Sequence, residues 1–417
     1  MEEHSHVFSV YQRTHRLTRR FDSKGAKRRR TLDFRTFSAA LGFQSKTIVN
    51  RFRLVYNKAK PVYENAFELN RFSAREGSQL KKVTMADVAK LANVSKSTVS
   101  QYLNKRYEYM SEETRKRIAE AIEELGYQPN VIARSLKQKT TATIGVIVFN
   151  MLHMMTTQVL HAIEEECQKR GFQVIVCNSG DDPDKEKTYI ETLLAKQVDG
   201  MIVFPTGKNE EVYRRLVEER FPLVFVDRMV PGVGADSVLL DNAGAAEMAV
   251  QYFASYGYER IAIVTPPLVP YNVPRMERFE GFRAAMEKRG FEVGDQNVIA
   301  AEPAALPEVL KQRLAEPKRP NALFAINDLT LMGVLRFVKE TGIRMPDELA
   351  IINIDDVPFA DIYTPALTTI AQPTFAMGKK AAERVFDQMK AKKTDGPRVF
   401  RFSPVLMERT SIRRGKA

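Results

Sequence analysis

A run of polar side chains between Lys96 and Gln101 carries groups that could bind a nucleic acid. The segment from Lys96 to Leu103 predicts a short helix whose apolar residues Val99 and Leu103, four positions apart, face inward. The side chains on the outer face offer an ammonium, hydroxyls and an amide, which can hydrogen bond to phosphates and base edges. These outward residues are Lys96, Ser97, Thr98, Ser100 and Gln101.

No arrangement for catalysis accompanies these groups. The sequence has no Gly-Xaa-Ser-Xaa-Gly, no phosphate-binding Walker loop and no His-Glu-Xaa-Xaa-His spacing. Its two cysteines, Cys167 and Cys177, cannot form a metal cluster by themselves. We therefore expect a protein that is not an enzyme and that needs no metal and no cofactor.

The residues before Lys96 predict the helix and turn that would position it. Thr84, followed three residues later by Asp87, is typical of a capping arrangement at a helix start. Asn93 tolerates the left-handed backbone of a tight turn, and Ser95 is an N-cap for the second helix. The apolar face predicted for the first helix consists of Met85, Val88, Ala89 and Leu91.

A third helix is predicted to close this unit. Ser111 caps it, and Gly126 and Pro129 end it. Its apolar stripe is Ile118, Ala119, Ile122 and Leu125. Two short helices joined by a tight turn, the second polar on its outer face, make a helix-turn-helix, which sets side chains against DNA base edges. Residues 83–129 are thus predicted to be a DNA-binding domain.

Composition and charge separate the first 82 residues from the rest. Residues 1–82 hold 19 Lys and Arg against 7 Asp and Glu, whereas residues 83–417 hold 45 against 44. This basic extension has no sustained helical or strand period. It fits either a disordered tail, translated from upstream of the true start codon, or an arm that grips DNA phosphates. We favour the first, because termini without apolar periodicity are usually unstructured.

The remaining chain predicts a large α/β core. The whole chain is 44% apolar, which is enough for a well-filled core, and no apolar run approaches the roughly 18 residues of a membrane span. No signal peptide is evident, so we expect a cytoplasmic location without membrane contact. Strand-like runs alternate with amphipathic stretches from residue 143 onward, which indicates parallel sheets covered on both faces. The runs are 144–149, 174–177, 201–204, 223–226, 238–240, 261–264, 323–326 and 349–354.

The number of these strands favours two lobes with a cleft between them over one open sheet. We place residues 143–417 in this ligand-binding and dimerisation domain, with a lobe boundary near residue 241 and a return near residue 372. Residues 130–142 connect the two domains. Leu136 in this linker could act as a wedge between base pairs in the minor groove or could belong to a helix packed on its neighbour. By itself the segment favours the packed helix.

The sequence resembles the lactose-repressor (LacI/GalR) family over residues 83 to about 410. The matching strings are VTMADVAKLANVSKSTVSQYLN, RIAEAIEELGYQPNVIARSL and TIGVIV, then VFVDR, RFEGF, FAIND and IDD with PALTTIAQP. Together they are far more specific than any one of them alone. The resemblance implies a helix-turn-helix headpiece, a hinge helix and a two-lobed core like the periplasmic sugar-binding proteins, acting as a homodimer on operator DNA.

The resemblance also implies roles for individual DNA-contacting residues. Lys96, Ser97 and Gln101 match positions that contact bases. The phosphate-contacting positions correspond to Thr84, Thr98, Ser100 and Asn104, and further matched positions are Ser95 in the turn and Asn130, Ala133 and Leu136 in the hinge. For the linker, the resemblance reverses the preference above and favours Leu136 as the wedge. Asn93 and Gln101 stand where the family more often has glycine and arginine, and Gln favours adenine where Arg favours guanine.

For the cleft, the resemblance implies a small sugar or sugar-acid effector. Carboxylates can accept two sugar hydroxyls, and guanidinium groups suit a carboxylate or phosphate, although ion pairing between the lobes is the structural alternative. The candidate ligand-binding residues are Asn150, Asp227, Arg228, Arg278, Asp328 and Asp355. The strings STVSQYLNKRYEYMSEETRKRIAEAI, ARSLKQK, FPTG and NDLTL are similar to the subgroup that responds to 2-keto-3-deoxygluconate. Such an acid would suit Arg228, Arg275 and Arg278 in one cleft.

These features predict a transcription regulator, with a repressor favoured over other modes. A sugar-phosphate effector and a co-repressor that tightens DNA binding remain alternatives. A sugar-binding transport component is a more distant one, disfavoured by the headpiece and the missing signal peptide. The C-terminal sequence lacks the heptad repeat of a tetramerising coiled coil, so a homodimer is expected.

Overall fold

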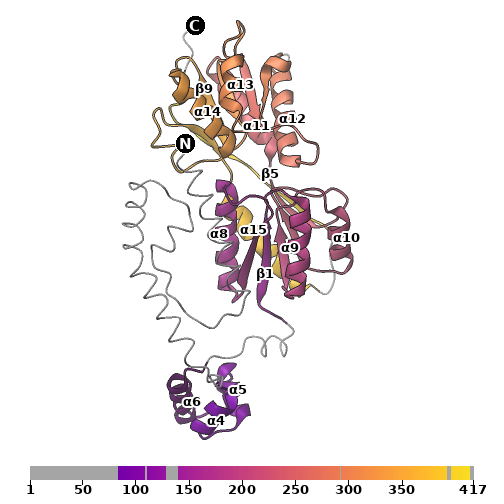
Figure 1. Ribbon diagram of the computed structural model, residues 1–417, viewed down its shortest axis with the longest axis vertical. Helices are drawn as coiled ribbons and strands as arrows, with labels where there is room; N and C mark the ends of the chain where they lie inside the picture. The colour runs from indigo at the N-terminus through magenta and orange to yellow at the C-terminus, as the bar shows by residue number, and fades with distance from the viewer. Residues whose placement is uncertain (1–82, 109, 128–139, 292, 392–395, 414–417) are drawn as a thin grey trace, which may run out of the picture. The chain divides into compact units, whose positions relative to one another are not determined.

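The computed structural model describes residues 83–108, 110–127, 140–291, 293–391 and 396–413. They fall into two units, separated after residue 128, and each is described by itself. The first unit holds three helices, α4 (Met85–Leu91), α5 (Lys96–Leu103) and α6 (Glu112–Leu125), labelled in Figure 1. No described helix is long and apolar enough to cross a membrane.

Local capping explains where the three helices begin and end. The Thr84 backbone N–H donates to Asp87 Oδ2 (2.8 Å), and Ser95 Oγ accepts from the Thr98 backbone N–H (3.1 Å). Ser111 Oγ accepts from the Thr114 N–H at the start of α6. Gly126 ends α6 with φ +58°, and Asn93 makes the turn with φ +51°. The predicted helix-turn-helix is confirmed.

Two details of the predicted apolar faces are wrong. Leu91 is 44% exposed, because Ala92 instead completes the buried stripe of Val88 and Ala89. In α6, Ala121 is buried rather than Ala119, since burial follows positions three and four apart from Ile118. The buried residues of this small core are Val88, Ala89, Ala92, Val99, Ile118, Ala121 and Tyr127.

The second unit contains two six-stranded sheets. The first has the order β11-β5-β4-β3-β1-β2, and all its strands are parallel. Helices lie on both faces, α8 (Met154–Lys169) with α15 (Thr374–Lys390) on one, and α9 (Pro183–Ala195) with α10 (Glu210–Glu218) on the other. The strands are β1 (Thr143–Val148), β2 (Gln173–Asn178), β3 (Gly200–Val203), β4 (Leu223–Val226), β5 (Asp236–Leu240) and β11 (Val399–Phe402). We call this part lobe 1.

Lobe 2 repeats this plan with the order β12-β10-β9-β8-β6-β7, in which β12 alone runs antiparallel to its neighbour. Helices α11 (Asn242–Ser255) and α12 (Val273–Glu287) cover one face, and α13 (Leu306–Arg313) and α14 (Asp328–Thr341) the other. A short 3-10 helix, η1 (Asp295–Asn297), precedes β7. The strands are β6 (Ile261–Thr265), β7 (Val298–Ala300), β8 (Ala322–Ala325), β9 (Ala350–Ile354), β10 (Thr368–Ala371) and β12 (Val405–Met407).

The chain passes between the lobes after β5, after β10 and again after β11. Helix α15 therefore lies beside α8 in lobe 1, although it follows all of β6 to β10 in the sequence (Figure 1). Gly378 permits this packing, because a Cβ there would lie 2.5 Å from the Val159 carbonyl oxygen of α8. The predicted α/β class with two lobes and parallel sheets is confirmed.

Candidate functional site

Helix α5 presents the predicted recognition side chains on its exposed surface. Lys96 and Gln101 are exposed, and neither side chain has a hydrogen-bond or ion-pair partner within residues 83–127 that are described. Ser97 is also exposed but its Oγ lies 2.6 Å from Ser95 Oγ. Because α5 is anchored through Val99, these polar groups can change partners without disturbing the core.

The other predicted DNA-contacting residues have structural partners as well. Thr84 Oγ1 donates to Asp87 Oδ2 (2.7 Å), Thr98 Oγ1 lies 2.8 Å from Ser95 Oγ, and Asn104 Nδ2 donates to the Ser100 carbonyl (2.7 Å). These bonds hold the two ends of α5 and the start of α4. The hinge predictions Asn130, Ala133 and Leu136 lie outside the described residues.

A cavity of about 60 Å³ lies between the lobes of the second unit. Four of the predicted ligand residues line it, namely Asp227, Arg228, Arg278 and Asp355, together with Arg275. The remaining lining residues are Phe149, His153, Met155, Asn272, Pro274, Ile326, Asn327 and Gln372. The cavity is small beside the roughly 300–1,000 Å³ of typical ligand pockets.

The two cavity aspartates occupy equivalent places in the two lobes. Asp227 follows β4 and Asp355 follows β9, with φ values of +65° and +85°. Each backbone N–H donates across to the neighbouring strand, Asp227 to Val238 and Asp355 to Ile370, both at 3.0 Å. Aspartate is among the few residues that enter the left-handed region readily. The bend at each strand end brings a carboxylate to the cleft.

The arginines reach the cavity from both lobes. Arg228 Nη1 donates to Asp181 Oδ1 (2.5 Å), and its guanidinium lies over the Phe149 ring at 4.3 Å. Arg278 Nε donates to Asn242 Oδ1 (2.8 Å) and its Nη1 to the Ile326 carbonyl (2.6 Å). Arg228 and Arg278 are each about 95% buried. Arg275 and Arg278 stand three apart on α12, so they share one helix face.

Burial dominates the electrostatics of this cavity. It raises the pKa of Asp227, against the opposing effects of Arg228 and Arg278. It also raises the pKa of Asp355, to about 6, despite the charge of Arg278. Burial and then the like charge of Arg228 lower the pKa of Arg275. Three arginines line the cavity beside two carboxyls, so its cationic side chains outnumber its acidic ones, which favours an anionic ligand.

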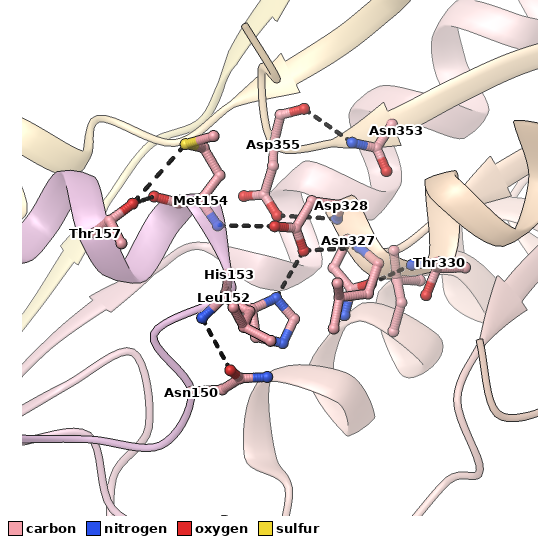
Figure 2. A network of polar contacts seen from close by, with 12 residues as sticks. Asn150, Leu152, His153, Met154, Thr157, Asn327, Asp328, Thr330, Asn353 and Asp355 are labelled. Carbon is pink, nitrogen blue, oxygen red and sulfur yellow. Dashed lines mark hydrogen bonds and ion pairs between the residues drawn. The ribbon is translucent and has the colours of Figure 1, made fainter. Parts of the chain in front are cut away.

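Two predicted ligand residues do not line the cavity. Asn150 Oδ1 accepts from the Leu152 backbone N–H (2.9 Å) and so shapes the turn before α8. Asp328 Oδ1 lies 2.6 Å from His153 Nδ1, and its Oδ2 accepts from the Met154 N–H at 2.8 Å (Figure 2). Both side chains are committed to the protein because they stand next to helix amino ends with amides to satisfy.

Four polar lining residues were not predicted from the sequence, namely His153, Asn272, Asn327 and Gln372. Asn272 Oδ1 caps α12 by accepting from the Arg275 N–H, and Gln372 Nε2 donates to Asp355 Oδ1 (2.6 Å). Asn272 precedes Pro274 at a helix start, which is a signal that could have been used. His153 and Gln372 carry no local signal, because distant segments bring them to the cavity.

Comparisons with known proteins agree with this architecture. Residues 84–130 match the family model described as bacterial regulatory proteins, lacI family, and residues 250–412 match a periplasmic binding protein-like domain. A probable HTH-type transcriptional regulator, EndR of Paenibacillus polymyxa, is 42% identical over 79% of this chain and 98% of its own. The chain belongs to the lacI family. This lacI-family protein is therefore a DNA-binding transcriptional regulator rather than an enzyme.

Two further relatives illustrate the family. The HTH-type transcriptional regulator KdgR of Bacillus subtilis (strain 168) is 32% identical over 74% of this chain and 92% of its own. A solved complex of the transcriptional regulator CelR with cellobiose is 27% identical, with a TM-score of 0.58, covering 79% of this chain and 99% of that one.

Proposed function

We propose that this lacI-family regulator is a homodimeric repressor whose grip on operator DNA is controlled by a sugar acid in the interlobe cavity. The proposal of a sugar-acid effector is supported by the cavity lining, in which Arg228, Arg275 and Arg278 lie together with two buried carboxyls. Two buried lining atoms, Arg228 Nε and Gln372 Oε1, have no hydrogen-bond partner within the described residues. A ligand with both donors and acceptors would satisfy them.

On the DNA side, residues 83–129 are proposed as the binding domain, 130–142 as the hinge and 143–417 as the effector and dimerisation domain. Lys96, Ser97 and Gln101 read base edges, while Ser95 positions the helix. Thr84, Thr98, Ser100 and Asn104 hold phosphates, and the hinge residues Asn130, Ala133 and Leu136 enter the minor groove. The exposed Lys96 and Gln101 support this assignment, because their side chains are available to DNA.

The effector proposed is 2-keto-3-deoxygluconate. Its carboxylate would pair with the arginines, and its hydroxyls would donate to Asp227 and Asp355. Similarity to KdgR supports this choice. A sugar phosphate suits the same arginines and is the alternative, and the CelR complex holds an uncharged sugar.

The proposed mechanism is thermodynamic linkage between effector binding and operator binding. If the effector prefers closed lobes and closure separates the two headpieces of the dimer, operator affinity falls. An effector that brings the headpieces to operator spacing would instead be a co-repressor.

The test is binding of the purified full chain to an operator fragment at fixed salt. The titration is run alone and with 2-keto-3-deoxygluconate, gluconate, ribose or their phosphates. Release by the keto acid alone supports the effector. Release by a sugar phosphate alone would make the sugar phosphate the effector in place of the keto acid. Specific DNA binding that no ligand changes would overturn the effector proposal but keep the proposal of DNA binding. Absence of specific DNA binding would overturn the whole proposal.

A further inference from the structure

The amino end of α8 in lobe 1 is capped by a residue of lobe 2. His153 stands at the N-cap position of α8, but its side chain makes no capping bond to that helix. Asp328 of α14 supplies the acceptor, since its Oδ2 takes the Met154 N–H at 2.8 Å. Its Oδ1 lies 2.6 Å from His153 Nδ1, so both oxygens hold lobe 1 (Figure 2).

Asp328 can reach across because its own helix is capped by its neighbour. Asn327 Oδ1 accepts from the Thr330 N–H at 2.8 Å and so satisfies the amino end of α14. Asp328 Oδ1 also accepts from the Leu329 N–H (2.8 Å), which fixes the carboxylate toward lobe 1. Of these two adjacent residues, Asn327 therefore caps α14 in lobe 2 and Asp328 caps α8 in lobe 1.

This single carboxylate lies between two helix amino ends and an imidazole. Each amino end carries a partial positive charge, so α8 and α14 would repel each other without an anion between them. The side chains of His153 and Asp328 are 14% and 10% exposed, which limits solvent screening. Burial raises the pKa of the Asp328 carboxyl, but the interactions with His153 and the hydrogen bonds from the Met154 and Leu329 backbone N–H groups together outweigh burial and lower it. Asp328 is thus a stable anion.

We propose that Asp328 is a positioning residue that latches the two lobes together by capping α8 across the cleft. The latch acts beside the cavity and not on the ligand, since Asp328 does not line it. A sugar-sized ligand exceeds the cavity of about 60 Å³, so the latch opens for entry and closes again over the ligand. The strength of the latch then sets the effector concentration needed for closure. This last step rests on the function proposed above.

The latch is tested first without any ligand, by hydrogen–deuterium exchange of the full chain. Asp328→Ala is expected to speed exchange of the Met154 amide and the first turn of α8 about 5- to 30-fold, the effect of losing a helix cap. Exchange in the second half of α8 stays unchanged. Asp328→Asn, which keeps an acceptor oxygen, gives a smaller increase. Asp361→Asn is the control, because Asp361 is an exposed lobe 2 aspartate.

Equal protection of the first turn of α8 in Asp328→Ala and the parent protein would overturn the latch, and so would faster exchange spread over all of lobe 1. The second arm repeats the operator titration with 2-keto-3-deoxygluconate. Both Asp328 variants should need more of it, again about 5- to 30-fold for alanine. An unchanged requirement would overturn the coupling step. Faster local exchange, in a protein that no ligand releases from DNA, keeps the latch and removes only the proposed effector.

Discussion

The headpiece and the two-lobed core carry their proposed sites in opposite ways. In the headpiece, the polar groups stand on the exposed face of one helix, α5, while Val99 alone is fully buried from that helix. In the core, Arg228, Arg278, Asp227 and Asp355 are all at least 90% buried and come from three segments in the two lobes. In the proposed function, the headpiece separates binding from stability, whereas the core uses the same side chains for both.

The largest effect is expected from Arg278→Ala, which should lower both the stability of the core and its response to the effector. Because Arg278 donates to Asn242 Oδ1 and the Ile326 carbonyl, its loss leaves two buried acceptors unpaired and should cost the core about 3 kcal/mol of unfolding free energy. Effector response should vanish too. Urea denaturation measures the first effect, and Arg283→Ala on the exposed side of α12 is the control. If the variant were as stable as the parent protein, Arg278 would not contribute to stability, and the contrast with the headpiece would fail.

The pH dependence of the unfolding free energy tests the raised pKa of Asp355 in the folded state. Its pKa in the folded state, about 6, lies above the usual value, so folding takes up a proton between about pH 4 and pH 6. The stabilisation from this group is complete below about pH 4 and is lost as the pH rises through 6. The parent protein should therefore lose up to about 3 kcal/mol relative to Asp355→Asn between pH 4 and 7. Parallel stability curves for the two proteins would contradict this.

Gln101→Ala should affect binding alone. Operator affinity should fall about 10- to 100-fold, the usual effect of one lost bidentate base contact. The melting temperature should not change, since the side chain is exposed. Fluorescence anisotropy at fixed salt and thermal denaturation give the two readings. A large drop in melting temperature would show that the headpiece also merges binding with stability.

The smallest expected effect comes from the helix caps. Ser111→Ala removes the cap of α6 and should cost the headpiece about 1 kcal/mol without a change in base preference. Ser95→Ala should cost a similar amount and also weaken operator binding, because Ser95 positions α5. Melting curves and operator titrations of both variants separate stability from binding. Equal DNA binding by the two would remove Ser95 from the proposed interface.

The same contrast explains what the sequence could predict. The caps at Thr84, Ser95, Ser111 and Gly126 depend on residues within four positions, so the headpiece helices were placed from local signals. In the core, the buried apolar strands were predicted. The missed strands are β7, β10, β11 and β12. Strands β7, β11 and β12 lie at sheet edges, and β10 begins with two threonines, so none of the four gives a clear apolar run.

The cleft shows the limit most clearly. Asp227 and Asp355 were predicted through the family resemblance, and each follows a buried strand in the structure. The bond from Asp328 to His153 joins residues 175 positions apart, and no periodicity connects them. The return of the chain to lobe 2 after β11 was likewise missed, since it involves only a short loop before β12. Non-local contacts thus decide which cleft residues line the cavity and which bind other protein groups.

In the proposed function, ligand binding in the buried cavity is coupled to DNA binding by the exposed headpiece. Calorimetry of 2-keto-3-deoxygluconate binding to the full chain, free and saturated with an operator fragment, tests this directly. Operator is expected to weaken the affinity for the keto acid by the same factor by which the keto acid weakens the affinity for operator. Binding of the keto acid with equal affinity to the free and the operator-bound protein would contradict it.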